Sequence, residues 1–163
     1  MNSRWLPLLG LLALLSAVPA GADDRSAPMA ASDVLRIARE SQAGWSLGRL
    51  QVREKDGKPP RVRVDLISGG KVVGRLRVDP RSGGFLGEGD ERGLAPAPLD
   101  LSRLRVDAER SLRDIEVGNR TWPTDHGRAW RVPLRYQGRV VGTIKVDVRQ
   151  GLLRPSPKTD GDD

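Results

Sequence analysis

Cysteine is missing from this 163-residue chain, and histidine occurs once, at His126. Without cysteine the fold has no disulfide, and zinc sites built from cysteine and histidine clusters are excluded. A serine nucleophile would need His126, which stands in PTDHGR, a stretch typical of a turn, and the chain has no G-x-S-x-G elbow. The acidic end TDGDD lacks the twelve-residue pattern of a strong calcium loop. We therefore expect no enzyme, no catalytic residue, no metal and no cofactor.

Long apolar runs are also scarce. The clearest, WLPLLGLLALLSAV, follows Arg4, is short for a bilayer span, and precedes the small residues Ala20-Gly21-Ala22. This pattern predicts a signal peptide over residues 1–22, cleaved after about Ala22, and a periplasmic or secreted mature protein. A short membrane anchor or a buried helix is the alternative.

Lysine and aromatic residues are few. Five lysines stand among 28 basic residues, aromatics make up 4% of the chain, and the formal net charge is +7. A charge carried mostly by arginine attracts acidic partners. Nucleic acid is a poor candidate partner for an exported chain whose strands offer no row of aromatic side chains for stacking.

The chain does contain a repeated stretch. GGKVVGRLRVDPRSGGFL begins at Gly69, and QGRVVGTIKVDVRQGLLR begins at Gln137. We expect an internal duplication, for which two unrelated basic hairpins are the alternative. The expected organisation is a disordered leader (23–31), a first repeat (32–86), a Gly/Pro-rich linker (87–98), a second repeat (99–153) and a disordered tail (154–163).

Helical spacing of apolar residues predicts one helix at the start of each half. The first helix is expected to begin at Ser32 or Asp33, and the second near Asp100 or Ser102. Their buried stripes are expected to comprise Val34, Ile37, Ala38, Ser41 and Trp45 in the first half, and Leu101, Leu104, Ala108, Leu112 and Ile115 in the second. Glycines are expected to end the helices: Gly44 and Gly48 in the first half and Gly118 in the second.

Alternating polarity predicts a hairpin in each half. Opposed residues must share a face, so Val64 is expected opposite Leu76, across a three-residue loop of Gly69-Gly70-Lys71. The second hairpin repeats this geometry around the loop Gln137-Gly138-Arg139.

A further strand is expected before each hairpin, over residues 47–54 and 116–122. The predicted fold class is therefore α+β, with two tandem repeats that each pack one helix on a three-stranded antiparallel β-meander. One sheet face would bury Trp45 or Trp130, and the other face would stay in water. The pattern leaves open whether the two sheets are continuous, and it does not indicate the oligomeric state.

The motif that closes the first hairpin resembles the PepSY family, whose hallmark is V-D-x-x-[ST]-G-x-[VIL]. Val78-Asp79, Ser82-Gly83 and Phe85-Leu86 match it roughly; the second half keeps Val146-Asp147 and Gly151 but has Gln150 in place of serine or threonine. The resemblance implies two tandem PepSY-like copies, the second diverged, and a partner that is a protease or a cell-envelope sensor. From the residues alone, Asp79 and Asp147 are expected to accept hydrogen bonds from the turn that follows them, with partner contact as the alternative.

Outward strand positions carry the candidate binding residues. The expected register sets Asp65 beside Arg75, a favourable pair, and Arg63 beside Arg77, an unfavourable one. Such charges either keep exposed faces soluble or bind an acidic protein, and lipid or lipopolysaccharide phosphates are a further alternative. The predicted function is an exported, non-catalytic protein-binding module that inhibits or regulates a protease or sensor. The candidate partner-binding face comprises Arg61, Arg63, Arg75, Arg77, Arg131, Arg135, Lys145 and Arg149.

Overall fold

The computed structural model describes residues 29–55, 58–87, 89–90 and 99–156. The expected signal peptide lies outside the described residues, as do most of the expected leader, linker and tail, so these stay predictions. Within the described residues, no helix combines the length and the apolar character that a membrane span requires.

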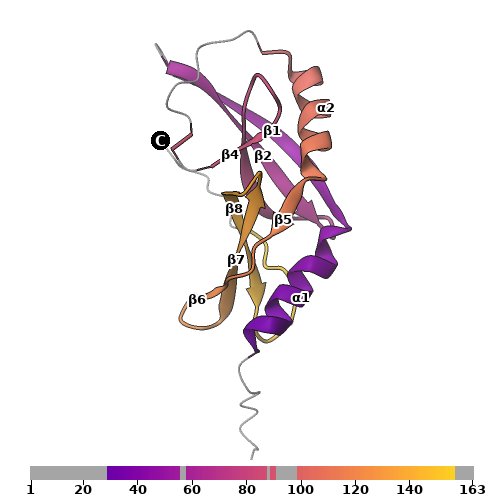
Figure 1. The fold of residues 1–163 in the computed structure, drawn as a ribbon, viewed down its shortest axis with the longest axis vertical. Coiled ribbons are helices and arrows are strands. Elements are labelled where there is room, and N and C mark those ends of the chain that lie inside the picture. Colours follow the sequence, from indigo (N-terminus) through magenta and orange to yellow (C-terminus); the bar gives the residue numbers. More distant parts are fainter. Residues whose placement is uncertain (1–28, 56–57, 88, 91–98, 157–163) are drawn as a thin grey trace, which may run out of the picture.

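The chain forms helices and antiparallel strands, in agreement with the predicted α+β class (Figure 1). The first half contains α1 (Ala31–Gln42), β1 (Trp45–Lys55), β2 (Lys58–Ser68), β3 (Lys71–Val78) and β4 (Phe85–Leu86). The second half contains α2 (Leu101–Leu112), β5 (Ile115–Val117), β6 (Trp122–Thr124), β7 (Ala129–Tyr136) and β8 (Arg139–Asp147).

The strands form two separate sheets. The first sheet has the order β1-β2-β3-β4. In the second sheet, β7 pairs with β8, and it also pairs with β5 and β6, which take consecutive parts of β7. Among the described residues, the two halves therefore do not share one hydrogen-bonded sheet.

The register predicted for both hairpins is confirmed, with Val64 opposite Leu76 and Val132 opposite Ile144. The predicted three-residue loops are wrong. Each turn has two residues, Gly69-Gly70 and Gln137-Gly138, and all of them have the positive φ that a tight two-residue turn needs. After each turn a β-bulge leaves one valine, Val73 or Val141, without a partner on the opposite strand. The extra residue shifts the pairing by one position, so the rest of the hairpin has the register that a three-residue loop would give. The bulge also turns Val73 and Val141 into the core.

The predicted helices extend too far. Trp45 begins β1 and Ile115 begins β5, yet both side chains are buried, so the apolar stripe continues from each helix into the strand that follows it. Gly48 lies inside β1 and Gly118 follows β5, so neither glycine ends a helix. The predicted start near Asp100 is confirmed, because its carboxylate accepts hydrogen bonds from two backbone N–H groups of the first turn.

Each helix packs mainly on the sheet of the other half. α1 contacts β5, β7 and β8, whereas α2 contacts β1 (Figure 1). The expectation that each helix covers its own meander is therefore wrong. Only two residues, Ala43-Gly44 or Arg113-Asp114, join each helix to its strand. Each helix consequently lies past the end of its own sheet, and the sheet of the other half covers its apolar face.

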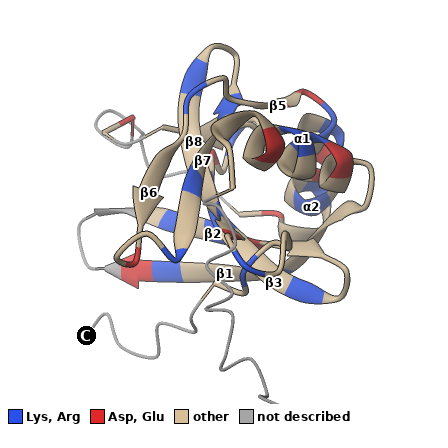
Figure 2. Ribbon diagram, turned by 90° about the horizontal axis from the view of Figure 1, so that it is seen from below, with Lys and Arg blue, Asp and Glu red and all other residues tan. Residues whose placement is uncertain are grey.

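The two sheets meet where β3 lies against β8. Gly74 and Gly142 occupy equivalent positions in this contact: a Cβ on Gly74 would lie 3.3 Å from the Thr143 carbonyl oxygen, and one on Gly142 would lie 2.7 Å from Leu76 Cδ2. The absence of side chains there lets the backbones approach closely. Figure 2 looks along the long axis and shows both helices on the same side of the molecule. Buried residues of both halves form one core.

The segments that follow the hairpins also reach across to the other half. Gly83 lies against Asp107 and Ala108 of α2, and Gly151 lies near Ile37 of α1. The Ser156 backbone N–H, in the predicted tail, donates to the Val72 carbonyl oxygen at 2.7 Å. The halves are thus interlocked through helices, hairpins and the segments that follow them.

Candidate functional site

The outer face of the first sheet carries a cluster of arginines that we call the arginine face. In it, Arg53 is paired with Arg61, and Arg63 with Arg77, as direct cross-strand neighbours. Like charges in this position destabilise a sheet. The predicted Asp65–Arg75 ion pair is present, with Arg75 Nε 3.1 Å from Asp65 Oδ1. All the arginines of this face have contacts within the chain. The arginine face comprises Arg53, Arg61, Arg63, Arg75 and Arg77.

The remaining candidate residues lie elsewhere, so the eight do not form one surface (Figure 2). On the second sheet, Arg131 lies opposite both Lys145 and Trp122, which is 40% exposed. The Nε atoms of Arg131 and Arg135 are buried and have no acceptor among the described residues. Arg149 lies in the turn after β8 and is exposed. The structure therefore divides the predicted face into two cationic surfaces and one separate arginine.

The predicted hydrogen bonds of the two strand-end aspartates are present. Asp79 accepts from the Arg81 N–H at 2.9 Å, and Asp147 accepts from the Arg149 N–H at 2.8 Å. The two loops differ at the second carboxylate oxygen. Ser82 Oγ donates to Asp79 Oδ2, whereas in the second half, where Gln150 replaces the serine, Arg154 donates to Asp147 Oδ2. Both carboxylates thus hold the turns that follow their strands.

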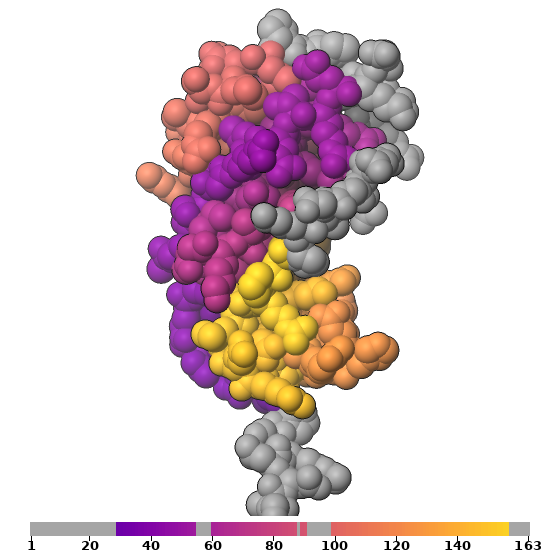
Figure 3. All heavy atoms as spheres, turned by 180° about the vertical axis from the view of Figure 1, so that it is seen from behind, coloured from indigo at the N-terminus to yellow at the C-terminus, as the bar shows by residue number. Residues whose placement is uncertain are grey.

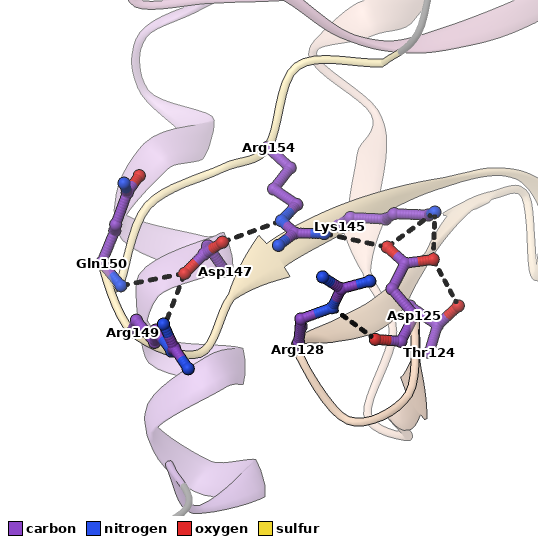
Figure 4. A network of polar contacts seen from close by, with 8 residues as sticks. All are labelled: Thr124, Asp125, Arg128, Lys145, Asp147, Arg149, Gln150 and Arg154. Carbon is purple, nitrogen blue, oxygen red and sulfur yellow. Dashed lines mark hydrogen bonds and ion pairs between the residues drawn. The ribbon is translucent and has the colours of Figure 1, made fainter. Parts of the chain in front are cut away.

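Four charged residues form an ion-pair cluster that ties the C-terminal segment to the second sheet (Figure 4). Asp125, in the turn between β6 and β7, accepts from Lys145 Nζ at 3.1 Å and from Arg154 Nη1 at 3.0 Å. Arg154 Nε also donates to Asp147 at 2.8 Å. No pattern in the sequence indicates this cluster, because Asp125 lies in a predicted turn and Arg154 at the start of the predicted tail.

The cluster holds the pKa of both aspartates down. A hydrogen bond from Lys145, with the charges of Lys145 and Arg154, lowers the pKa of Asp125 although desolvation opposes the shift. Burial alone would raise the pKa of Asp147, but hydrogen bonds from Gln150 N–H, Arg154 and Arg149 N–H outweigh it and lower that pKa.

Acid is therefore expected to weaken the cluster. Each carboxylate has a lower pKa in the folded state than its unfolded value of about 3.9, so the folded state binds fewer protons. The stabilisation is complete above the unfolded pKa and is lost as the pH falls through the folded pKa. In urea unfolding between about pH 5 and pH 2, we expect the free energy of the wild type to fall more steeply than that of Asp147→Asn. Asp114→Asn, an exposed residue outside the cluster, should follow the wild type, and identical slopes for all three proteins would contradict this.

The polar residues that could serve a reaction or a metal either lie exposed or make hydrogen bonds within the fold. His126 lies at an exposed turn with a φ of 56°. A depression of about 670 Å³ lies beside Asp79, Asp90, Tyr136 and Arg139. Its Asp90 carboxylate accepts from Gly87 N–H and Arg139, each at 2.8 Å. In the described part of the chain, no three residues of the histidine, cysteine, aspartate and glutamate types group as a metal site would require.

Comparison of the chain with protein-family models, curated proteins and solved structures finds no match in any of the three. The function is therefore inferred from the geometry of the described residues. The described residues form two cationic sheet surfaces, one shared core and several strand edges.

Proposed function

We propose that this chain is an exported, non-catalytic module that binds an acidic protein partner through the arginine face. The observation that carries the proposal is the register that sets Arg53 against Arg61 and Arg63 against Arg77. These pairs concentrate positive charge on one face of the sheet, although each arginine also has a contact within the chain. Carboxylates of a partner would be attracted by that charge, which would also speed the encounter.

The arginine face has a rigid support. β2 is hydrogen-bonded on both sides, and its buried residues belong to the common core, so the arginine face is held on a rigid support. A rigid face binds without losing much conformational freedom. The resemblance of the turn motif to PepSY modules supports a partner that is a protease or an envelope sensor, which this chain would inhibit or regulate.

We also propose that the two halves are copies of one PepSY-like unit of a helix and a three-stranded meander. Residues that lie the same distance apart in the two copies play the same parts. Gly74 and Gly142 meet where the sheets touch, and Asp79 and Asp147 accept equivalent backbone hydrogen bonds. In this proposal the helices have exchanged sheets.

The second cationic surface favours another candidate function, the binding of anionic headgroups of lipids or lipopolysaccharide. Trp122 is exposed directly beside Arg131, with Lys145 on the far side of that arginine. Tryptophan next to cationic side chains suits the boundary between headgroups and acyl chains. This surface lies on a different sheet from the arginine face, so the two candidates can be tested separately.

Reversing one charge on the arginine face is expected to weaken partner binding without unfolding the protein. Glutamate in Arg77→Glu would face Arg63 directly and replace a repulsive pair with an attractive one. A photoreactive residue at the exposed position 61 would first capture the partner in intact cells. Binding of the purified partner is then expected to weaken about tenfold or more in Arg77→Glu, with a shallower salt dependence.

Arg113→Glu is the matched control, because it makes the same change in net charge at an exposed arginine beyond α2. It should bind the partner like the wild type. Equal weakening in both variants would reduce the effect to overall charge. Capture of lipid alone, with retention on anionic but not zwitterionic vesicles, would replace the protein-binding proposal with the headgroup candidate.

A further inference from the structure

Among the described residues, other parts of the chain cover two strand edges, those of β8 and β3. The outer edge of β8 is covered by the C-terminal segment, where Leu153 bridges to Val146 and the Arg154 N–H donates to the Lys145 carbonyl oxygen at 2.8 Å. The edge of β3 is covered by β4 at one end and by the Ser156 N–H at the other. These contacts occupy backbone groups that could otherwise pair with another chain.

The edge of the second sheet opposite β8 is formed by two short strands, β5 and β6, and is therefore discontinuous. β5 and β6 have only three residues each and are separated by residues 118–121. Pro123 within β6 has no N–H to donate, and Gly118 is pressed against Pro133, where an added Cβ would lie 2.6 Å from its Cγ. An incoming strand finds no continuous row of backbone donors and acceptors there.

The edge of β1 is different, because most of it is not paired with any described strand or segment. β1 has 11 residues at the border of the first sheet, and its pairing with β2 is irregular between Leu47 and Leu50 and between Arg53 and Lys55. Arg105 of α2 caps its beginning by donating to the carbonyl oxygens of Leu47 and Gly48, each at 3.0 Å. From Arg49 to Glu54 no described residue pairs with this edge. Figure 3 shows β1, in purple, at the molecular surface next to α2.

The side chains along this open edge alternate in character. Leu50 and Val52 point to the core side and are only partly buried, so a neighbouring strand could cover them further. Gln51 and Arg53 point to the outer side, where Arg53 is exposed and lies opposite Arg61. A strand added here would place every second residue beside Leu50 and Val52, and the residues between beside Gln51 and Arg53.

We propose that residues 49–54 of β1 accept an extended segment of the protein partner as an additional strand of the first sheet. The segment alternates apolar residues, which cover Leu50 and Val52, with glutamate or aspartate, which lie beside Arg53. Backbone hydrogen bonds supply affinity, and the alternation supplies specificity. This inference rests on the proposed function, since it assumes that the arginine face meets an acidic protein.

The test uses the full mature chain and a fluorescent peptide of about ten residues that alternates glutamate with valine or threonine, a length that matches a typical strand. We expect saturable binding in a fluorescence anisotropy titration. A peptide of the same sequence with N-methyl groups on alternate residues keeps every charge but cannot pair along one edge. It is expected to bind at least about tenfold more weakly. Equal binding of the two peptides would overturn strand addition.

Two protein variants locate the site. Val52→Lys points a charge into the new strand pair and should abolish peptide binding. Val117→Lys makes the same change at a half-buried valine of β5 and should bind normally. Hydrogen exchange should slow at 49–54 when the peptide is bound, which checks the location without any substitution. No slowing at these residues would overturn the proposal even if Val52→Lys failed to fold.

The outcomes separate this inference from the function on which it rests. If binding is lost in Arg77→Glu but is unchanged by N-methylation, the arginine face still binds acidic chains and only strand addition fails. If neither the alternating peptide nor a block polyglutamate binds at low salt, both proposals fail.

Discussion

Replacing Gly83 with alanine is expected to lower the free energy of unfolding by about 3 kcal/mol or more. Gly83 has a φ of 70°, a conformation that costs a side-chain-bearing residue about 1–2 kcal/mol. An added Cβ would also overlap Asp107 Cβ and lie 2.9 Å from the Ala108 nitrogen. These atoms are the backbone of α2 and the Cβ of Asp107, which cannot rotate away, so the overlap is relieved only if the loop and the helix separate.

Two other glycines provide controls in the same chain. Gly69 has a φ of 55°, and no described atom lies within 4 Å of an added Cβ, so Gly69→Ala measures the backbone term alone, about 1–2 kcal/mol. Gly151 occupies the equivalent position to Gly83, but an added Cβ would make only ordinary contacts at 3.5 and 3.6 Å. Urea unfolding should rank Gly83→Ala far below the other two. Three equal losses would show that the contact with α2 contributes nothing.

Separating the two halves is expected to abolish folding of each. A piece containing residues 29–90 keeps α1 and the first sheet but loses β5, β7 and β8, on which α1 packs. A piece containing residues 99–156 loses β1, on which α2 packs. It also loses α1, which covers the second sheet. Each piece would expose buried residues of the shared core, so neither retains the favourable burial that offsets chain entropy.

The measurement is circular dichroism and amide NMR dispersion of each piece alone and of an equimolar mixture. Each piece alone should show poor dispersion and no cooperative melting, whereas the mixture should recover a folded spectrum. The control is the full chain cut at a protease site introduced within 91–98, which should stay associated after cleavage. A cooperative melt of either piece alone would show that the halves are independent domains.

Local signals explain what could be predicted from the sequence. Face alternation placed Val64 opposite Leu76 because a shift of one residue would expose every buried residue of the strand. The glycines of the turns and the hydrogen bonds of Asp79 and Asp147 to the following backbone involve residues only a few positions apart. A short segment of sequence is therefore enough to predict them. The bulges at Val73 and Val141 were missed because a bulge and a longer loop give the same parity.

Long-range contacts explain what could not be predicted. A helix stripe indicates that a face is buried but not which sheet buries it, so the exchange of α1 and α2 was missed. Trp45 and Ile115 face the core from strands, and their spacing extended the helical pattern by coincidence. Asp125 and Arg154 meet only because the C-terminal segment returns along β8, a contact that no short motif records.

The exchanged helices have a consequence for how the protein comes into being. A ribosome makes α1 long before it makes β7 and β8, which must cover that helix. However early α1 is synthesised, it therefore cannot reach its packed position before these strands are available. A chain that stops before β8 would leave the apolar face of α1 without the sheet that covers it.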